Sequence, residues 1–186
     1  MDSKRVKIIN ASLKLFVNLG VHTVTIAQIG KEAKVGIGTI YKHFKDKEDI
    51  IQQIWIEQKK QEASYVFAHY KSTGTVKERF DYLWGKVIDY FVEHPLEYQF
   101  SYQFASSPIL TDSIHQTAMK AFLAFDELFQ EGLEQNLFKK LKPNHLRLFT
   151  FGTVNGYILW ALDERIAFED DFKNILLQML WDAIKT

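Results

Sequence analysis

Residues 25–47 read TIAQIGKEAKVGIGTIYKHFKDK, a pattern that predicts two short helices joined by a tight turn. The first four residues have the form of a capping box, in which Thr25 bonds a free backbone amide and Gln28 bonds back to the cap. The first helix can continue to about residue 33. Lys34-Val35-Gly36 then supplies the turn, with glycine where the backbone bends sharply.

The second short helix is expected from about residue 37 to residue 44. At about 100° per residue, Ile40 and Phe44 share one face and are predicted to pack inward. The opposite face carries small, hydroxyl and basic groups, with Tyr41 at its flank. A helix-turn-helix that reads DNA needs this division, because one face packs on the partner helix and the other enters the major groove.

The outward residues suit contacts with DNA. Gly38 permits close approach, Thr39 offers a hydroxyl and a methyl to base edges, and Ile37 and Thr39 are expected to influence base preference. By spacing alone, a plain helical hairpin with a solvated basic face is an equal alternative. The residues predicted to contact DNA are Thr25, Gln28, Gly36, Ile37, Gly38, Thr39, Tyr41, Lys42, His43 and Lys47.

A family resemblance favours the DNA-binding alternative. The run VGIGTIYKHFKDKEDI, residues 35–50, resembles the helix-turn-helix signature of the TetR family of bacterial transcriptional regulators, and the similarity extends back through residues 25–29 and the first helix. It covers about the first 50 residues. One departure is Lys34, where many members carry glycine. The resemblance implies a homodimer that binds a pseudo-palindromic operator and responds to a small molecule.

Composition agrees with this interpretation. Formal net charge is zero, but residues 1–60 hold 11 Lys+Arg and 6 Asp+Glu, whereas residues 61–186 hold 12 and 17. A basic head favours a polyanionic partner. The chain has no cysteine and no secretory signal pattern, and its charge-free runs, such as residues 148–162, are too short to span a membrane. We therefore expect a soluble, cytoplasmic protein.

The pattern after residue 47 is helical throughout, so the predicted fold class is all-α. A DNA-binding domain of three helices, residues 1–46, is expected to precede a larger helical effector-binding and dimerisation domain, residues 47–186. Helical segments are expected at 4–19, 25–33, 37–44, 47–70, 76–92, after Pro95, and at 110–137, 144–165 and 170–184.

Motifs for catalysis and metal binding are absent from the sequence. There is no HExxH, no P-loop and no GxSxG, and no ExxH pair. An acidic cluster at Glu164, Glu169, Asp170 and Asp171 is interpreted as capping and solvation of the last helix rather than as a metal site. We predict no enzymatic activity, no cofactor and no metal.

Aromatic residues are concentrated in the second part of the chain. Of 27 aromatic residues, 23 follow residue 60. At helical spacing such residues more often form a core than a pocket. The resemblance nevertheless implies an effector pocket among the C-terminal helices, and an aromatic lining suits a flat or lipophilic molecule. The residues predicted to line it are Trp84, Tyr98, Tyr102, Phe122, Phe125, Asn155 and Trp160.

The sequence and the resemblance together predict a homodimeric DNA-binding regulator, expected to be a repressor, whose subunits pair through residues of about 144–184. The competing hypothesis is a helical ligand carrier or protein-interaction module whose basic head binds an acidic protein. Such a module would show exposed Leu, Phe or Trp anchors on the second short helix. Glycine, threonine, lysine and histidine lie there instead, which favours nucleic acid.

Overall fold

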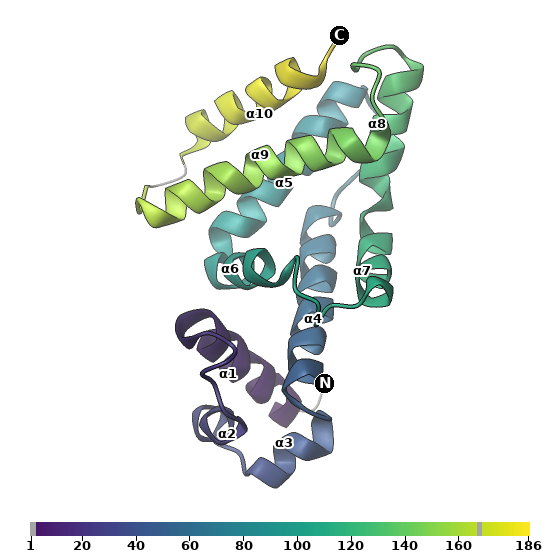
Figure 1. Cartoon of the computed structure of the whole chain (residues 1–186). Helices are drawn as coiled ribbons and strands as arrows, with labels where there is room; N and C mark the ends of the chain where they lie inside the picture. The colour runs from purple at the N-terminus through teal and green to yellow at the C-terminus, as the bar shows by residue number, and fades with distance from the viewer. Residues whose placement is uncertain (1–2, 167–168) are drawn as a thin grey trace. The chain divides into compact units, whose positions relative to one another are not determined.

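The computed structural model describes residues 3–166 and 169–186, and within these residues the fold is all-α, as predicted (Figure 1). The helices are α1 (Ser3–Leu19), α2 (Ile26–Ala33), α3 (Ile37–His43), α4 (Lys47–Val66), α5 (Val76–Glu93), α6 (Pro95–Phe104), α7 (Asp112–Met119), the 3₁₀ segment η1 (Lys120–Phe122), α8 (Leu123–Glu134), α9 (Pro143–Asp163) and α10 (Asp170–Ile184). None of the described helices is long and apolar enough to cross a membrane.

The chain forms two compact units. Unit 1 contains residues up to 60 together with 94–118, and unit 2 contains 61–93 together with residues from 119 onward. The three N-terminal helices therefore share a unit with the first part of α4, with α6 and with nearly all of α7. The sequence predicts a domain boundary after residue 46, so the predicted DNA-binding domain is smaller than unit 1. That boundary stays a prediction.

Unit 1 has one apolar core. Ile8 and Phe16 of α1, Ile29 of α2 and Ile40 of α3 are fully or almost fully buried in it. Helix α4 contributes Ile50, Ile51 and Ile54, and α6 contributes Phe100 and Phe104, whose rings stack with centroids 4.5 Å apart. Because α4 and α6 fill the same core as the first three helices, the head is supported by residues that follow it in sequence.

Unit 2 is organised around α5. The apolar face of α5 is buried, with Phe80 in edge contact with Trp181 of α10 and with Phe129 of α8. Two ion pairs join the same helices, Arg79 with Glu131 and Lys173 with Asp89. The aromatic residues of this unit thus form a packed core around α5.

Two helix predictions need correction. Helix α4 ends at Val66 rather than near residue 70. The single helix expected over residues 110–137 is two helices, α7 and α8, joined by η1. Phe122 at this break is buried, and the centre of its ring lies 6.1 Å from the ring centre of Phe67 and 6.5 Å from that of Phe125. Short 3₁₀ segments serve as connectors between helices, and Phe122 of this segment packs within unit 2.

Three described helices end on a non-glycine residue in the left-handed conformation: Lys34, Asn136 and Arg165, each with φ of 56°. At Lys34 the amide bonds Lys31 O at 3.3 Å, and the amide of Val35 bonds Gly30 O at 2.9 Å, which is the Schellman pattern. The turn between α2 and α3 is therefore retained although Lys34 replaces glycine, and the cost is backbone strain at a residue with a Cβ atom.

We predict that Lys34→Gly raises the free energy of unfolding by about 1 kcal/mol, because glycine adopts the left-handed conformation without steric strain. Lys34→Ala is the matched control, since it removes the charge but keeps the Cβ atom. Urea denaturation followed by circular dichroism, at one protein concentration, measures both. Equal stabilisation by the two substitutions would contradict the strain explanation and indicate an effect of charge.

Candidate DNA interface

The N-terminus of α2 carries the predicted capping box. The amide of Gln28 donates to Thr25 Oγ1 at 3.3 Å, and the amide of Thr25 donates to Gln28 Oε1 at 2.8 Å. Both bonds satisfy amides that a helix start leaves without partners. Thr25 and Gln28 are exposed, so the α2 N-terminus is fixed in shape and open to solvent. A helix start of this kind is suited to bind a phosphate group.

The geometry between α2 and α3 depends on Gly30. A Cβ atom at this position would lie 3.0 Å from Val35 O, which is closer than a side chain normally approaches a backbone oxygen. Glycine thus allows α2 to approach the turn that leads into α3. On α3 itself, Ile40 and Phe44 face the core of unit 1, as predicted, and are almost completely buried. Helix α3 is therefore held rigidly along one side.

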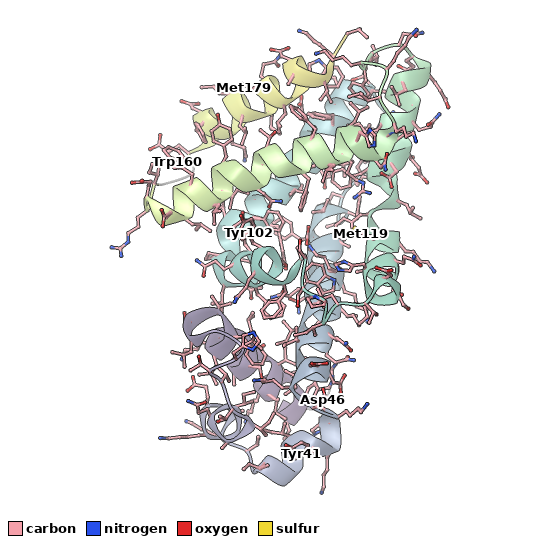
Figure 2. All side chains as sticks on the ribbon, in the orientation of Figure 1. Tyr41, Asp46, Tyr102, Met119, Trp160 and Met179 are labelled. Atoms are coloured by element: carbon pink, nitrogen blue, oxygen red, sulfur yellow. The ribbon has the colours of Figure 1, made fainter. Side chains whose placement is uncertain are left out.

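The opposite side of α3 is open. The apolar side chain of Ile37 is 48% exposed. The aromatic side chain of Tyr41 is 56% exposed (Figure 2). Gly36, Gly38 and Lys42 are exposed as well, while Thr39 and His43 are half-buried. This side of a short, rigid helix therefore combines an apolar side chain, two glycines, hydroxyl groups and basic groups. These are the groups that contact base edges and phosphates in a major groove.

Lys47 has a second role that the sequence did not indicate. Its ammonium donates to Val21 O at 2.7 Å and to Val24 O at 3.1 Å, and thereby joins the start of α4 to the connection between α1 and α2. An ammonium group has three donors, so one donor is left for a phosphate. Lys47 thus supports the head mechanically whether or not it contacts DNA.

Further contacts fix α4 within unit 1. Arg5 Nη2 donates to Gln53 Oε1 at 2.9 Å, which links α1 with α4. Gln52 Nε2 donates to Ile109 O at 2.8 Å, which links α4 with the segment before α7. These pairs are 48 and 57 residues apart in the chain, and no local pattern signals them.

A hollow of about 430 Å³ lies between α1 and α2 and was also not predicted. It is lined mainly by polar and charged side chains, and the pair of Lys14 with Glu32, 2.7 Å apart, lies in its wall. The hydrogen bond and charge of Lys14 lower the pKa of Glu32. Because both partners are exposed, this pair contributes little to stability.

The residues predicted to line an effector pocket are divided between the two units. Trp84, Phe122 and Phe125 lie in unit 2, where Trp84 and Phe125 are in edge contact at 5.1 Å. Tyr98 and Tyr102 belong to α6 in unit 1. Tyr98 is buried and its burial raises the pKa of its hydroxyl, whereas Tyr102 is exposed (Figure 2).

Two members of the predicted lining lie on α9, in unit 2. Trp160 is exposed and Asn155 is half-buried. The exposed position of Trp160 suits an interface better than a closed pocket. Among the described residues, no cluster of three or more metal-ligating side chains was found. The side chain of Asp170, from the predicted acidic cluster, lies outside the described residues.

The rigid α2–α3 pair with its open recognition face defines a helix-turn-helix DNA-binding protein. Comparison with known families gives the family. Residues 8–54 match the family described as bacterial regulatory proteins, tetR family, and residues 75–185 match the tetracyclin repressor-like C-terminal domain. The chain belongs to the TetR family of transcriptional regulators.

Individual relatives agree with this assignment. The chain is 25% identical to the fatty acid metabolism regulator protein of Bacillus subtilis over 97% of its own length and 95% of that protein. It is 49% identical to the transcriptional regulator HbdR of Aromatoleum sp., but over 51 residues that span only 22% of that protein. The crystal structure of FadR from Bacillus subtilis in complex with stearoyl-CoA has the same fold, with a TM-score of 0.78, 23% identity and coverage of 94% of this chain and 96% of that chain.

We predict that Gly38→Ala weakens binding to operator DNA by about tenfold or more, because the added methyl group projects from the face that approaches the duplex. No atom lies within 4 Å of the added Cβ in the free protein, so the free energy of unfolding should stay equal or rise by less than about 1 kcal/mol. Fluorescence anisotropy with the duplex that the wild type selects measures the affinity.

Gly85→Ala is the matched control for this experiment. Its Cβ would make an ordinary contact, 3.8 Å from Leu177 Cδ1, in the middle of α5. It should leave DNA affinity unchanged. Wild-type affinity in Gly38→Ala would contradict the assignment of this face of α3 to DNA.

Proposed function

We propose that this TetR-family regulator is a homodimeric repressor that binds a pseudo-palindromic operator and is released from it by a lipophilic small molecule. The observation that carries the proposal is the open face of α3, held on a rigid base by Ile40 and Phe44. DNA recognition needs both features, because a side chain reads a base edge only from a fixed position.

The residues of the head take different roles in this proposal. Ile37, Gly38 and Thr39 begin α3 and read base edges. Tyr41 and Lys42 are exposed and bind phosphates on one side. The other proposed DNA contacts flank this face and bind the sugar-phosphate backbone. These residues are Thr25, Gln28, Gly36, His43 and Lys47.

The proposed dimer contact is an exposed apolar face on α9 and α10, two helices that pack together through Tyr157 and Phe172. On α9, Leu148 is 71% exposed, and Phe149 and Trp160 are about half exposed. On α10, Ile175 is exposed. Met179 on the same helix is exposed as well (Figure 2). Monomeric proteins rarely leave so many large apolar side chains of neighbouring helices in solvent.

Two glycines make this face suitable for a second copy of the chain. Gly152 and Gly156 are exposed, and a Cβ atom at either would meet no atom within 4 Å. A helix of a partner subunit can therefore approach the backbone of α9 closely. The predicted dimer segment, about 144–184, includes residues 167–168, which lie outside the described residues. TetR-family regulators bind operators and dimerise, which supports the proposal.

The proposed effector is an acyl compound. Its support comes from the relatives, since one is a fatty acid metabolism regulator and another was crystallised with stearoyl-CoA. Such a ligand is lipophilic, as the aromatic composition suggests. Binding would have to favour a conformation with low affinity for DNA, because a ligand shifts an equilibrium only by its difference in affinity for the two states.

The competing hypothesis, a ligand carrier or protein-interaction module without specific DNA binding, is less well supported. It does not explain the glycines and the hydroxyl and basic groups on the open face of α3, and family membership favours the regulator. We propose that the protein acts as a regulator and not as an enzyme. Action on operator DNA in a bacterium also implies a location in the cytoplasm.

The substitution Gly156→Leu tests the proposed dimer interface and the dependence of operator binding on the dimer. We expect the dimer to dissociate about tenfold to hundredfold more readily, because the bulky side chain meets the partner twice in a two-fold interface. Operator affinity should fall in parallel, since each half-site contact depends on the partner. Sedimentation equilibrium and DNA anisotropy measure the two effects.

Ala121→Leu serves as the control, because it adds bulk at an exposed position of η1, outside α9 and α10. It should leave both constants unchanged. A Gly156→Leu protein that remains a dimer with full operator affinity would contradict the proposed interface.

A further inference from the structure

Two buried hydrogen-bond donors of α4 lack an acceptor. Trp55 is 4% exposed and Gln58 is 5% exposed. Among the described residues, neither Trp55 Nε1 nor Gln58 Nε2 has a hydrogen-bond partner. Burial of a donor without an acceptor costs folding free energy, and such a group in a native protein calls for an explanation, such as a water, an ion or a ligand.

The two donors lie on one side of α4, because residues three apart on a helix are neighbours. Ser101 Oγ of α6 donates a hydrogen bond to Gln58 Oε1 at 3.3 Å. This bond fixes the orientation of the amide and leaves its nitrogen, Nε2, without an acceptor among the described residues. The indole nitrogen of Trp55 can only donate. The unmatched groups therefore call for an acceptor and not for another donor.

The surroundings of Trp55 add positive charge and a further polar ring. The ammonium of Lys59, itself buried, lies 5.1 Å from the centre of the Trp55 ring. The imidazole of His115 on α7 meets the same ring edge-on at 5.4 Å. Two N–H donors on one side of a helix favour an acceptor with partial or full negative charge, such as a carbonyl or carboxylate oxygen.

Apart from these groups, the neighbourhood is apolar. Trp55 belongs to the core of unit 1, together with Ile51 and Ile54 of α4 and Phe100 and Phe104 of α6. Ligand sites typically combine such an apolar lining with a few polar groups that fix orientation. An inorganic anion would gain nothing from the apolar side chains, whereas an acyl group presents an oxygen and an apolar chain in one molecule.

We propose that Trp55 Nε1 and Gln58 Nε2 bind the acyl oxygen of the effector, either the carboxylate of a free acid or the carbonyl of a thioester. This inference rests on the proposed function, since it names the polar group by which the acyl effector is recognised. None of the residues predicted from the sequence to line a pocket belongs to this donor pair.

The position of the donors gives the ligand a route to the DNA-binding head within unit 1. Trp55 and Gln58 lie two to three turns along α4 from Lys47, whose ammonium holds the carbonyls of Val21 and Val24. A movement of α4 that brings the donors onto an acyl oxygen is therefore transmitted to the start of α2. This supplies a two-state element that both the ligand and DNA bias.

The test compares the full-length wild type with Trp55→Phe and Gln58→Leu by isothermal titration calorimetry, with stearate and stearoyl-CoA below their micellar concentrations. Trp55→Phe keeps an aromatic ring and removes only the N–H donor and part of the ring. We expect each variant to bind the effective probe about tenfold more weakly or worse. Trp181→Phe is the control, because Trp181 packs on Phe80 and Phe138 in unit 2, and it should bind as the wild type does.

The outcomes separate the donor assignment from the effector class. Weaker binding of stearate by the variants supports a carboxylate, and weaker binding of stearoyl-CoA alone supports a thioester carbonyl. If the wild type binds a probe and both folded variants bind it equally well, the donors hold only a buried water and the inference is overturned. If the wild type binds neither probe, the acyl effector itself is wrong and the donor assignment falls with it.

Discussion

The hydrogen bonds from Lys47 to Val21 O and Val24 O are the interaction on which the DNA-binding head depends most directly. They attach the first residue of α4 to the segment that ends α1 and begins α2. Without them, two carbonyl groups beside the capping box would lose a charged donor. The buried isoleucines of α4 extend the same attachment into the core. Helix α4 thus supports the DNA-binding head and also carries the donors proposed to bind the effector.

Local patterns predicted the parts of the head that depend on neighbours in sequence. The capping box at Thr25 and the inward packing of Ile40 and Phe44 follow from spacing alone, and the structure confirms both. The resemblance to the TetR family was also correct. The roles of individual residues in DNA and effector binding stay predictions.

Interactions between distant segments escaped prediction for a physical reason. The bonds from Arg5 to Gln53 and from Gln52 to Ile109 each join residues about fifty positions apart, and no periodicity encodes such pairs. One long helix was predicted over residues 110–137 because the helical spacing of apolar residues continues through residues 118–125. The structure instead has two helices joined by η1. At Lys34 the turn was predicted from the local sequence, but the left-handed backbone conformation of this residue was not.

The central claim is that two copies of α3 read a symmetric DNA site, and selection from a random pool of duplex DNA at near-physiological salt tests it most directly. The account predicts enrichment of an inverted repeat whose half-site centres are separated by about one helical turn of DNA or a multiple of it. Recovery of no preferred sequence by a folded, dimeric protein, or of a single asymmetric site, would contradict it.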